Sequence, residues 1–312
     1  MSFDLNILAH GTSKVIQLMD QVNGTMVEIH CKGGLMNRWT VKNEGQGLEL
    51  ILGNLGEADF EMNGFRSGKM SPFSCRVDGG QYQLENQTYE FKKYYLGPHA
   101  LHGLIYDAEF SIQSSEVHHD YAQVLLSYAY EGADPGYPFP YDIQVQWTLY
   151  NDNLIRIKTM VVNKSNKTIP YMDGWHPYFT LGGQVDNYEL EFQSNEKLTM
   201  RDDMIPTGYK IQENKFDKGL MIGNAHYDDC YLLDPKQNMI QISYEGKSII
   251  VRPLHNYPYL QIYTPDDRKS IAIENLSGAP DCFNNKMGLQ QLEPQGQIYF
   301  ETTYQFNTTP KP

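Results

Sequence analysis

Two ionisable residues stand in unusually apolar stretches of this sequence. Glu274 lies in IAIENL, residues 271–276. A carboxylate on so apolar a strand pairs with a cation or works as a base, unless it faces solvent at the end of its strand. His176 lies in GWHPYF, residues 174–179, an aromatic-rich stretch suited to stacking against a sugar ring. The alternative is that this histidine is a satisfied residue of the core.

Other polar positions carry weaker signals. His102, in ALHG, has the same two interpretations, and His99 has a weaker case because it follows a proline in a predicted loop. Asp228 and Asp229 precede the apolar run CYLL, where adjacent acids usually form a solvated turn or a cap. Arg76, just ahead of the turn DGG, is by itself a surface charge.

Common cofactor and metal motifs are missing. No G-x-G-x-x-G follows a strand, no H-E-x-x-H occurs, and Gly68-Lys69 is followed by Met70 where a phosphate-binding loop needs Ser or Thr. We therefore exclude nucleotide and zincin chemistry, and we expect neither a cofactor nor a bound metal. The four cysteines are far apart and form no C-x-x-C pair, which argues against a disulfide framework or a structural zinc site.

The net charge of the chain excludes some classes of binding partner. The 312 residues include 25 Lys and Arg against 38 Asp and Glu, a net charge of −13 at pH 7. Nucleic acids and anionic lipids are poor partners for such a surface, because binding their phosphates needs a basic footprint. No run of about 18 apolar residues is present, so no membrane span is expected. The N-terminus lacks a signal-peptide pattern, and we expect a cytoplasmic protein.

The elements that must position these residues are predicted to be β-strands. The 23 Tyr, 13 Phe and 3 Trp favour half-buried sheet surfaces. Apolar and polar residues alternate in 141–149, 155–161 and 298–306, which is typical of antiparallel strands with one buried face. No window has the apolar spacing of an amphipathic helix, so the chain is predicted to be all-β. Further strands are predicted at 26–31, 48–52, 81–84, 104–112, 121–130, 188–193, 229–233, 239–244, 248–252, 258–263 and 270–274.

The chain is predicted to form one domain over 1–312. No Pro- and Ser-rich linker, shift in composition or internal repeat interrupts it, and large sandwiches often exceed 200 residues. The polar tail 307–312, which ends in Pro-Lys-Pro, is predicted to be disordered.

Short motifs follow one another in a definite order. They are CRV with GQY within 75–82, LHG at 101–103, GYP at 136–138, HPYF at 176–179, Asp228 before the run at 230–233, and TP with IAIE within 264–274, followed by SGAPDCFN at 277–284. In this order, on an all-β chain, they resemble the aldose 1-epimerase (galactose mutarotase-like) family. The resemblance covers about Gly34 to Phe306.

This resemblance implies a fold, a reaction and a set of site residues. The fold is a large antiparallel β-sandwich (the galactose mutarotase-like supersandwich) with a sugar in a cleft on one concave face. The family interconverts the α and β anomers of free aldoses by general acid–base catalysis, without a redox cofactor. By analogy Glu274 is the base and His176 is the acid. The residues that hold the ring oxygen and the ring hydroxyls are His102, Arg76 and Asp228.

The same analogy sets further expectations. Asp229 is one register away from Asp228 and is the alternative sugar contact. At neutral pH His176 is expected to be protonated while Glu274 is ionised, so that each charge favours the active state of the other. The expected partner is a small-molecule sugar, bound by a monomer or a homodimer.

Three positions depart from the family pattern. Cys75 and Trp175 stand where the family often has Asn, and Leu104 stands where a second Gly is frequent. All three are expected near the sugar. They therefore leave open which sugar binds, whereas the expected reaction is unchanged.

Three other functions fit the same motifs less well. A mutarotase for a phosphorylated hexose would need a cationic pocket, for which Arg66, Lys69 and Arg76 are candidates. The net charge weighs against it, since long-range repulsion opposes such a substrate. A sugar-binding protein without activity would have no need of the His176 and Glu274 pair. A glycosidase could use Glu274 with Asp228, but the HPYF motif has no place in that mechanism.

Overall fold

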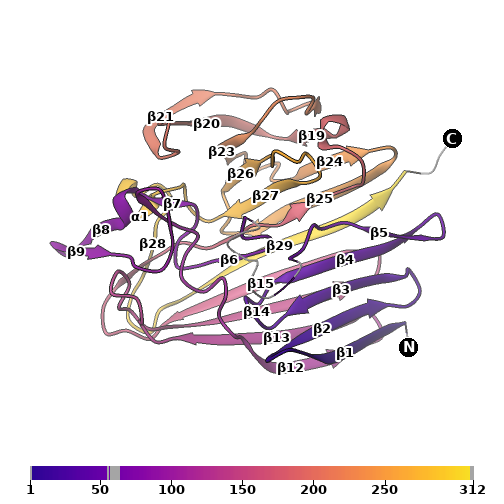
Figure 1. Ribbon diagram of the computed structural model, residues 1–312, viewed down its shortest axis with the longest axis horizontal. Coiled ribbons are helices and arrows are strands. Elements are labelled where there is room, and N and C mark those ends of the chain that lie inside the picture. Colours follow the sequence, from indigo (N-terminus) through magenta and orange to yellow (C-terminus); the bar gives the residue numbers. More distant parts are fainter. Residues whose placement is uncertain (1, 55, 57–63, 310–312) are drawn as a thin grey trace.

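The largest sheet contains the three segments whose alternation is clearest in the sequence (Figure 1). The computed structural model describes residues 2–54, 56 and 64–309. In β14 the odd-numbered side chains from Tyr141 to Leu149 are buried, and in β15 those from Ile155 to Val161, which confirms both predictions. The nine strands, all antiparallel, lie in the order β12 (Ser111–Val117), β13 (Tyr121–Tyr130), β14 (Tyr141–Tyr150), β15 (Leu154–Asn163), β29 (Gln297–Thr308), β25 (Lys247–His255), β24 (Ile240–Tyr244), β19 (Glu189–Phe192) and β22 (Leu220–Met221).

Two sheets lie over this one and complete the predicted sandwich (Figure 1). The five-stranded sheet is β1 (Phe3–His10), β2 (Ser13–Asp20), β3 (Thr25–His30), β4 (Met36–Asn43) and β5 (Gln46–Glu49). The eight-stranded sheet is β21 (Pro206–Gln212), β20 (Ser194–Met200), β23 (Asp228–Leu233), β26 (Tyr259–Tyr263), β27 (Ile271–Leu276), β17 (Gly174–Trp175) and β6 (Lys69–Met70), with β18 (Tyr178–Phe179) also paired to β27. The two sheets are joined where Leu52 N–H donates to the carbonyl of Tyr178 at 2.8 Å.

Short elements close the end of the sandwich where the predicted site residues gather. The strands are β10 (Tyr95–Leu96), β11 (His99–Leu101) and β7 (Arg76–Val77) in one sheet, β16 (Ile169–Tyr171) with β28 (Gln290–Leu292), and β8 (Gln81–Leu84) with β9 (Gln87–Glu90). The helical segments are single turns: α1 (Cys282–Asn285) and two 3₁₀ turns, η1 (Asp78–Gly80) and η2 (Val185–Asn187). No helix in the described residues is long and apolar enough to cross a membrane.

The space between the layers is filled by one hydrophobic cluster that draws on residues from Phe3 to Phe306. Trp147, in β14, is among its largest members and is 1% exposed. Burial of a large apolar side chain of this kind contributes about 1.5–3 kcal/mol, which is why the alternation in the long strands fixes which face of each sheet points inward. The prediction of one domain over 1–312 stays a prediction.

Several strands were not predicted, and one predicted strand begins later than expected. Edge strand β1 is exposed along most of its length and shows no alternation, and β2, β4, β20 and β21 were not predicted either. The strand predicted at 104–112 begins only at Ser111. In the residues before Ser111, the backbone makes single hydrogen bonds to other segments instead of pairing with a neighbouring strand. Leu104 N–H donates to Ser71 C=O at 2.7 Å, and Phe110 N–H donates to Cys31 C=O at 2.9 Å. A buried apolar run therefore forms a loop here.

The C-terminal tail is ordered further than predicted. Strand β29 runs to Thr308, with Asn307 opposite Ser248 in β25. The backbone of these residues is held by the ladder, so the disorder predicted from residue 307 is wrong as far as Thr308. Residues 310–312 lie outside the described residues.

Candidate active site

A cavity of about 400 Å³ opens beside the eight-stranded sheet, and all five residues selected from the sequence line it. They come from separate elements: Arg76 from β7, His102 from the loop after β11, His176 from the residue after β17, Asp228 from the start of β23 and Glu274 from β27. The rest of the wall is mostly apolar and aromatic. It consists of Gly64, Phe65, Cys75, Tyr94, Leu96, Leu101, Tyr178, Met200, Met204, Gln261, Tyr263 and Pro280.

Glu274 is held in the middle of the eight-stranded sheet. Strand β27 pairs with β26, β17 and β18, and all six of its residues are buried. Glu274 Oε1 lies 3.4 Å from His176 Nε2, whereas Oε2 is buried and has no hydrogen-bond partner among the described residues. An unpaired buried oxygen costs about 1–3 kcal/mol, and such an atom is expected where a ligand supplies the missing hydrogen bond.

The backbone and two rings fix His176. Its N–H donates to Gly68 C=O at 3.2 Å, and its own C=O accepts from Ser67 N–H at 2.9 Å. The imidazole stacks on Tyr178, with ring centroids 4.9 Å apart and planes 9° apart. Its other side meets the edge of His102 at 4.9 Å. The imidazole therefore has one orientation, with Nε2 directed at Glu274.

A strained turn presents His102. This residue has a left-handed φ of 57°, and its N–H donates to Cys75 C=O at 3.0 Å. The next residue, Gly103, has a φ of 84°, and a Cβ there would lie only 2.4 Å from Ser71 O, so only glycine fits. The third residue type of the LHG motif thus follows from the close approach of two backbone segments.

The structure distinguishes the two adjacent aspartates. Asp228 faces the cavity and accepts a hydrogen bond from Gln261 Nε2 at 2.6 Å. Asp229 points to the other face of β23, where Lys197 Nζ lies 2.6 Å from its carboxylate. Of the pair left open by the sequence, Asp228 is the one that reaches the cavity.

Burial changes the protonation expected for the central pair. It raises the pKa of Glu274 well above its usual value, with a further rise from the charge of Asp228 and an opposing effect of Arg76. Burial lowers the pKa of His176 to about 4. Both shifts favour the neutral form of each group and oppose the ion pair expected from the sequence. The physical reason is that both are almost completely removed from water, which penalises each charge.

The other polar groups of the cavity respond to the same low-dielectric surroundings. Burial, His176 and Arg76 together lower the pKa of His102 well below its usual value, so this imidazole is neutral. Burial raises the pKa of Asp228, while the charge of Arg76 and the hydrogen bond from Gln261 act against the rise. Arg76 is thus the cation whose field favours ionised carboxylates here.

Several residues expected near the sugar lie elsewhere. Trp175 is buried on the far side of its strand, with its ring 5.2 Å from that of Trp147, and it does not line the cavity. Leu104 is buried and also lies outside the lining, so of the three departures from the family pattern only Cys75 reaches the cavity. His99, the weaker histidine candidate, lies between Asp78 and Asp203, its ring nitrogens 3.3 Å from each carboxylate.

Sequence reasoning missed Gln261 and the apolar wall. Gln261 sits directly opposite Glu274 in the β26–β27 ladder and is 5% exposed. A signal was present, since Gln261 interrupts the apolar run YLQIY as Glu274 interrupts IAIENL. Met200 and Met204 carried no such signal, because their place at the cavity depends on how the β20–β21 hairpin packs.

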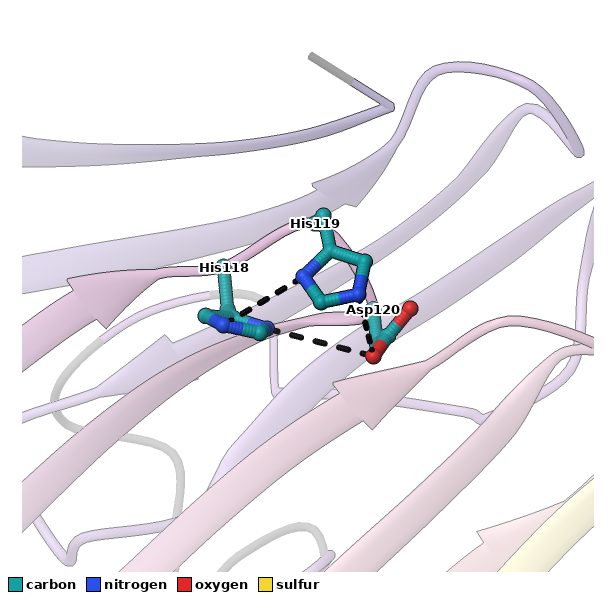
Figure 2. A group of neighbouring side chains, drawn as sticks. All are labelled: His118, His119 and Asp120. Carbon is teal, nitrogen blue, oxygen red and sulfur yellow. Dashed lines mark hydrogen bonds and ion pairs between the residues drawn. The ribbon is translucent and has the colours of Figure 1, made fainter.

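A second group of ligand-type side chains lies on the surface, at the turn between β12 and β13 (Figure 2). His119 Nε2 is 2.9 Å from Asp120 Oδ2, and His118 Nε2 is 3.3 Å from His119 Nδ1. Their side chains are 51–75% exposed and bond to one another. A metal ion would have to displace these contacts and bind three side chains that are largely exposed to water, so this turn is a poor metal site.

Three comparisons relate the chain to known proteins. A family model described as aldose 1-epimerase matches residues 14–305. An aldose 1-epimerase of Streptococcus thermophilus is 24% identical, with 92% of this chain and 93% of that protein covered. The uncharacterized protein YihR of Escherichia coli is also 24% identical, with 80% of each covered. The crystal structure of a galactose mutarotase-like protein from Clostridium acetobutylicum shares the fold, with a TM-score of 0.88 at 18% identity over 99% of both chains.

Proposed function

The chain belongs to the aldose 1-epimerase family, and we propose that it interconverts the α and β anomers of a free hexose by opening and reclosing the sugar ring. One observation carries the proposal: a carboxyl group and an imidazole face each other at 3.4 Å in the wall of a cavity of about 400 Å³. Both retain a buried polar atom that no other described residue bonds, Glu274 Oε2 and His176 Nδ1. Ring opening needs one base and one acid at adjacent oxygens of the sugar, and this pair can supply both.

In the proposed reaction Glu274 removes the proton of the C1 hydroxyl. The bond between C1 and the ring oxygen then breaks, its electron pair moves to the ring oxygen, and His176 protonates that atom. The sugar is now an open-chain aldehyde. Rotation about C1–C2 presents the other face of the carbonyl, and the reverse proton transfers close the ring as the second anomer. Both residues end in their starting states.

The pKa shifts of His176 and Glu274 are compatible with these roles. The neutral pair and the ion pair contain the same single proton, so moving it from Glu274 to His176 creates base and acid together without uptake from water. Arg76 favours this transfer, since its charge stabilises ionised Glu274. Hydrogen bonds from sugar hydroxyls to the carboxylate would add to that effect.

The remaining polar groups are proposed to hold the sugar. Arg76 can donate to ring oxygens, neutral His102 can donate or accept one hydrogen bond, and Asp228 can accept from a hydroxyl while Gln261 fixes its orientation. Tyr178 and the apolar wall can cover the C–H faces of the ring. The substrate class this favours is a neutral sugar.

The geometry weighs against a phosphorylated hexose. Lys69 is fully buried and paired with Asp173 at 2.5 Å, away from the cavity lining. Arg66 donates to Gly53 C=O at 3.2 Å and does not line the cavity either. Of the three cations considered, Arg76 alone remains for a phosphate dianion, and it already faces two carboxyl groups.

Polarimetry on freshly dissolved α-D-glucose and α-D-galactose tests the proposal. The protein is expected to speed the approach to anomeric equilibrium, and Glu274→Gln to abolish that effect. If neither sugar responds but α-D-glucose 6-phosphate does, the phosphosugar alternative replaces the proposal. If none of the three responds while a sugar still binds by calorimetry, the protein is a sugar binder.

A further inference from the structure

A group of buried polar residues lies behind the cavity and takes no part in lining it. It consists of Lys69, Ser71, Tyr141, Tyr171, Asp173 and Tyr257, here called the Lys69 network. Lys69 and Asp173 are both 0% exposed. Moving two charged groups from water into the core has a large desolvation cost, and an apolar pair of the same shape is often as stable. The buried pair therefore needs an explanation other than stability.

The charges of the pair are fully met by directional bonds. Lys69 Nζ lies 2.5 Å from Asp173 Oδ2, donates to Gly174 C=O at 3.3 Å and sits 4.3 Å from the centre of the Trp175 ring. Asp173 Oδ2 also accepts from Tyr257 OH at 2.6 Å, and Oδ1 accepts from Tyr171 OH at 3.1 Å. Burial lowers the pKa of Lys69 to about 8, while Asp173 opposes the fall, so the ammonium keeps its charge at neutral pH.

The network holds the chain immediately before His176. Lys69 bonds to the segment 173–175, which immediately precedes this histidine, and Trp175 is opposite Lys69 in the β17–β6 ladder. Any shift of Lys69 or Asp173 must therefore be passed to the backbone of His176. No intervening loop is long enough to absorb it.

The same network is tied to the strand that carries Glu274. Asp173 N–H donates to Ser277 Oγ at 2.8 Å, and Ser277 N–H donates back to Asp173 C=O at 2.9 Å. Ser277 directly follows β27, and Gly174 is opposite Leu276 in the ladder. The segments that carry the base and the acid of the proposed reaction are thus joined at one residue: the backbone of Asp173 bonds to Ser277, and its carboxylate bonds to Lys69, Tyr171 and Tyr257.

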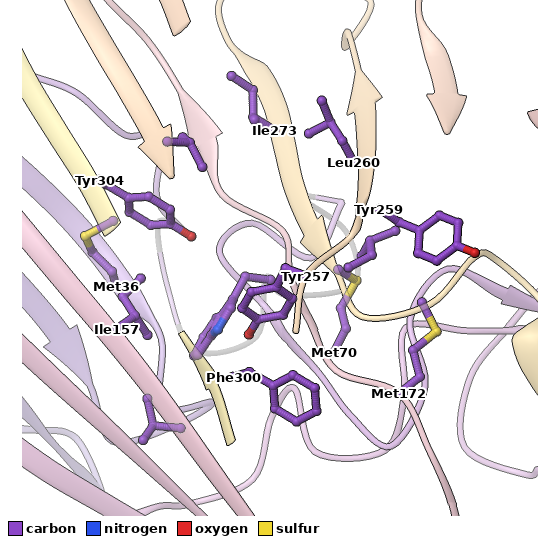
Figure 3. Packing of buried hydrophobic residues seen from close by; sticks show 14 of the residues in the cluster. Met36, Met70, Ile157, Met172, Tyr257, Tyr259, Leu260, Ile273, Phe300 and Tyr304 are labelled. Atoms are coloured by element: carbon purple, nitrogen blue, oxygen red, sulfur yellow. The ribbon is translucent and has the colours of Figure 1, made fainter. Parts of the chain in front are cut away.

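A chain of hydroxyl groups extends the network to the third segment of the site. Tyr171 OH bonds to Ser71 Oγ at 2.8 Å, and Ser71 Oγ bonds to Tyr141 OH at 2.9 Å. The carbonyl of Ser71 accepts from Leu104 N–H at 2.7 Å and packs against Gly103, the residue next to His102. The far end of the network, Tyr257, is anchored in the core, with its ring 5.6 Å from that of Phe300 (Figure 3).

We propose that the Lys69 network is the positioning device of this site, which sets His176, Glu274 and His102 at their working distances without touching the sugar. This inference rests on the proposed function for its kinetic part. Directional bonds between fully buried partners have one low-energy arrangement, whereas apolar packing tolerates sliding. A displacement of about 1 Å at a catalytic group can cost on the order of 10²-fold in rate.

Tyr171→Phe and Tyr257→Phe test the proposal, because each removes one hydrogen bond to Asp173 and keeps the ring. Tyr188→Phe is the matched control: Tyr188 is equally buried, its OH donates to Gly182 C=O at 2.8 Å, and it belongs to no part of the network. Each network variant is expected to lower kcat about 10-fold with KM changed less than about twofold. The control is expected to lose similar thermal stability and keep its kcat.

A readout independent of activity separates this inference from the proposed function. The imidazole NMR signals of His176 and His102, assigned with His176→Gln and His102→Gln, are expected to shift in both network variants and not in Tyr188→Phe. Unchanged imidazole signals overturn the positioning role, and so does a loss of kcat that merely matches the control. If the wild-type protein accelerates no sugar, the proposed function fails while the NMR comparison still decides the positioning role.

Discussion

This protein buries two pairs that each combine a basic and an acidic side chain, Lys69 with Asp173 and His176 with Glu274. The pairs differ in how completely the protein satisfies their hydrogen bonds. Lys69 and Asp173 sit behind the cavity, where two tyrosine hydroxyls and a backbone carbonyl complete their hydrogen bonds. His176 and Glu274 lie in the cavity wall, 3.4 Å apart, and within the part of the chain that the structure describes each has a buried polar atom without a hydrogen-bond partner.

The difference separates a structural role from a chemical one. A carboxylate whose lone pairs are all used by the protein has nothing left to offer a ligand, and its geometry is rigid. A carboxyl group with an unpaired oxygen in a cavity destabilises the fold, but that oxygen stays available to bind a substrate. Burial alone would have ranked both pairs equally as catalytic candidates.

The largest expected effect separates the pairs by activity. Glu274→Gln should lower kcat by about 10³-fold, within the range of about 10²–10⁴ typical of one acid–base group. Its unfolding temperature should not fall, because the amide removes a buried carboxyl whose charged form is disfavoured. Anomer-exchange kinetics and thermal unfolding measure the two quantities. A residual rate within tenfold of wild type would remove Glu274 from its proposed role.

The second effect separates the pairs by stability. Asp173→Asn leaves Lys69 as an uncompensated buried charge, and the free energy of unfolding should fall by about 3–5 kcal/mol in urea titrations. The double variant Lys69→Met with Asp173→Asn removes both charges and should recover a large part of that loss. A single variant as stable as the double one would show that the two charges do not depend on each other.

The third effect is the pH dependence of stability that the cavity pair contributes. The pKa of His176 is lowered from 6.5 to about 4 in the folded protein, so its stabilising contribution is full above pH 6.5 and is lost as pH falls towards 4. Wild type should therefore lose about 2–3 kcal/mol more than His176→Gln between pH 7 and pH 4.5. Urea titrations at the two pH values give the difference. Equal losses would mean that His176 is not held neutral.

Glu274 should act in the opposite direction. Its folded pKa is raised, so its contribution is full below about pH 4.5 and is lost as pH rises through the folded value. The stability advantage of Glu274→Gln over wild type should consequently grow from pH 5 to pH 8.

The smallest effect concerns the two adjacent aspartates. Asp228→Asn should raise KM about 10-fold with little change in kcat, since a hydrogen bond to a charged group is worth about 1.5–3 kcal/mol. Asp229→Asn, at the Lys197 ion pair on the other face of the strand, should leave KM within about twofold. Equal changes in KM would contradict the assignment of Asp228 to the cavity.

Much of the fold could be predicted from local patterns, and the exceptions have different causes. The alternation in β14 and β15 predicts both the strands and their buried faces, because half-buried strands repeat every two residues. Edge strand β1 has no buried face, so its sequence lacks the alternation of apolar and polar residues that predicts a strand. The buried loop at 104–110 looks like a strand because its partners, Ser71 and Cys31, are far away in the sequence.

The sequence by itself determined the all-β class and the ordered motifs, because residue type and spacing carry that information. The resemblance of those motifs to the aldose 1-epimerase family then pointed to five of the side chains that line the cavity. Only the tertiary structure decided that Asp228 and not Asp229 faces the cavity, that Lys69 pairs with Asp173 behind it, and that burial shifts the pKa values of His176 and Glu274 against an ion pair. The physical reason is that distance and burial arise from segments far apart in the sequence, such as Lys69 and Asp173, which are 104 positions apart. Those two quantities, rather than residue type, set hydrogen bonding and pKa.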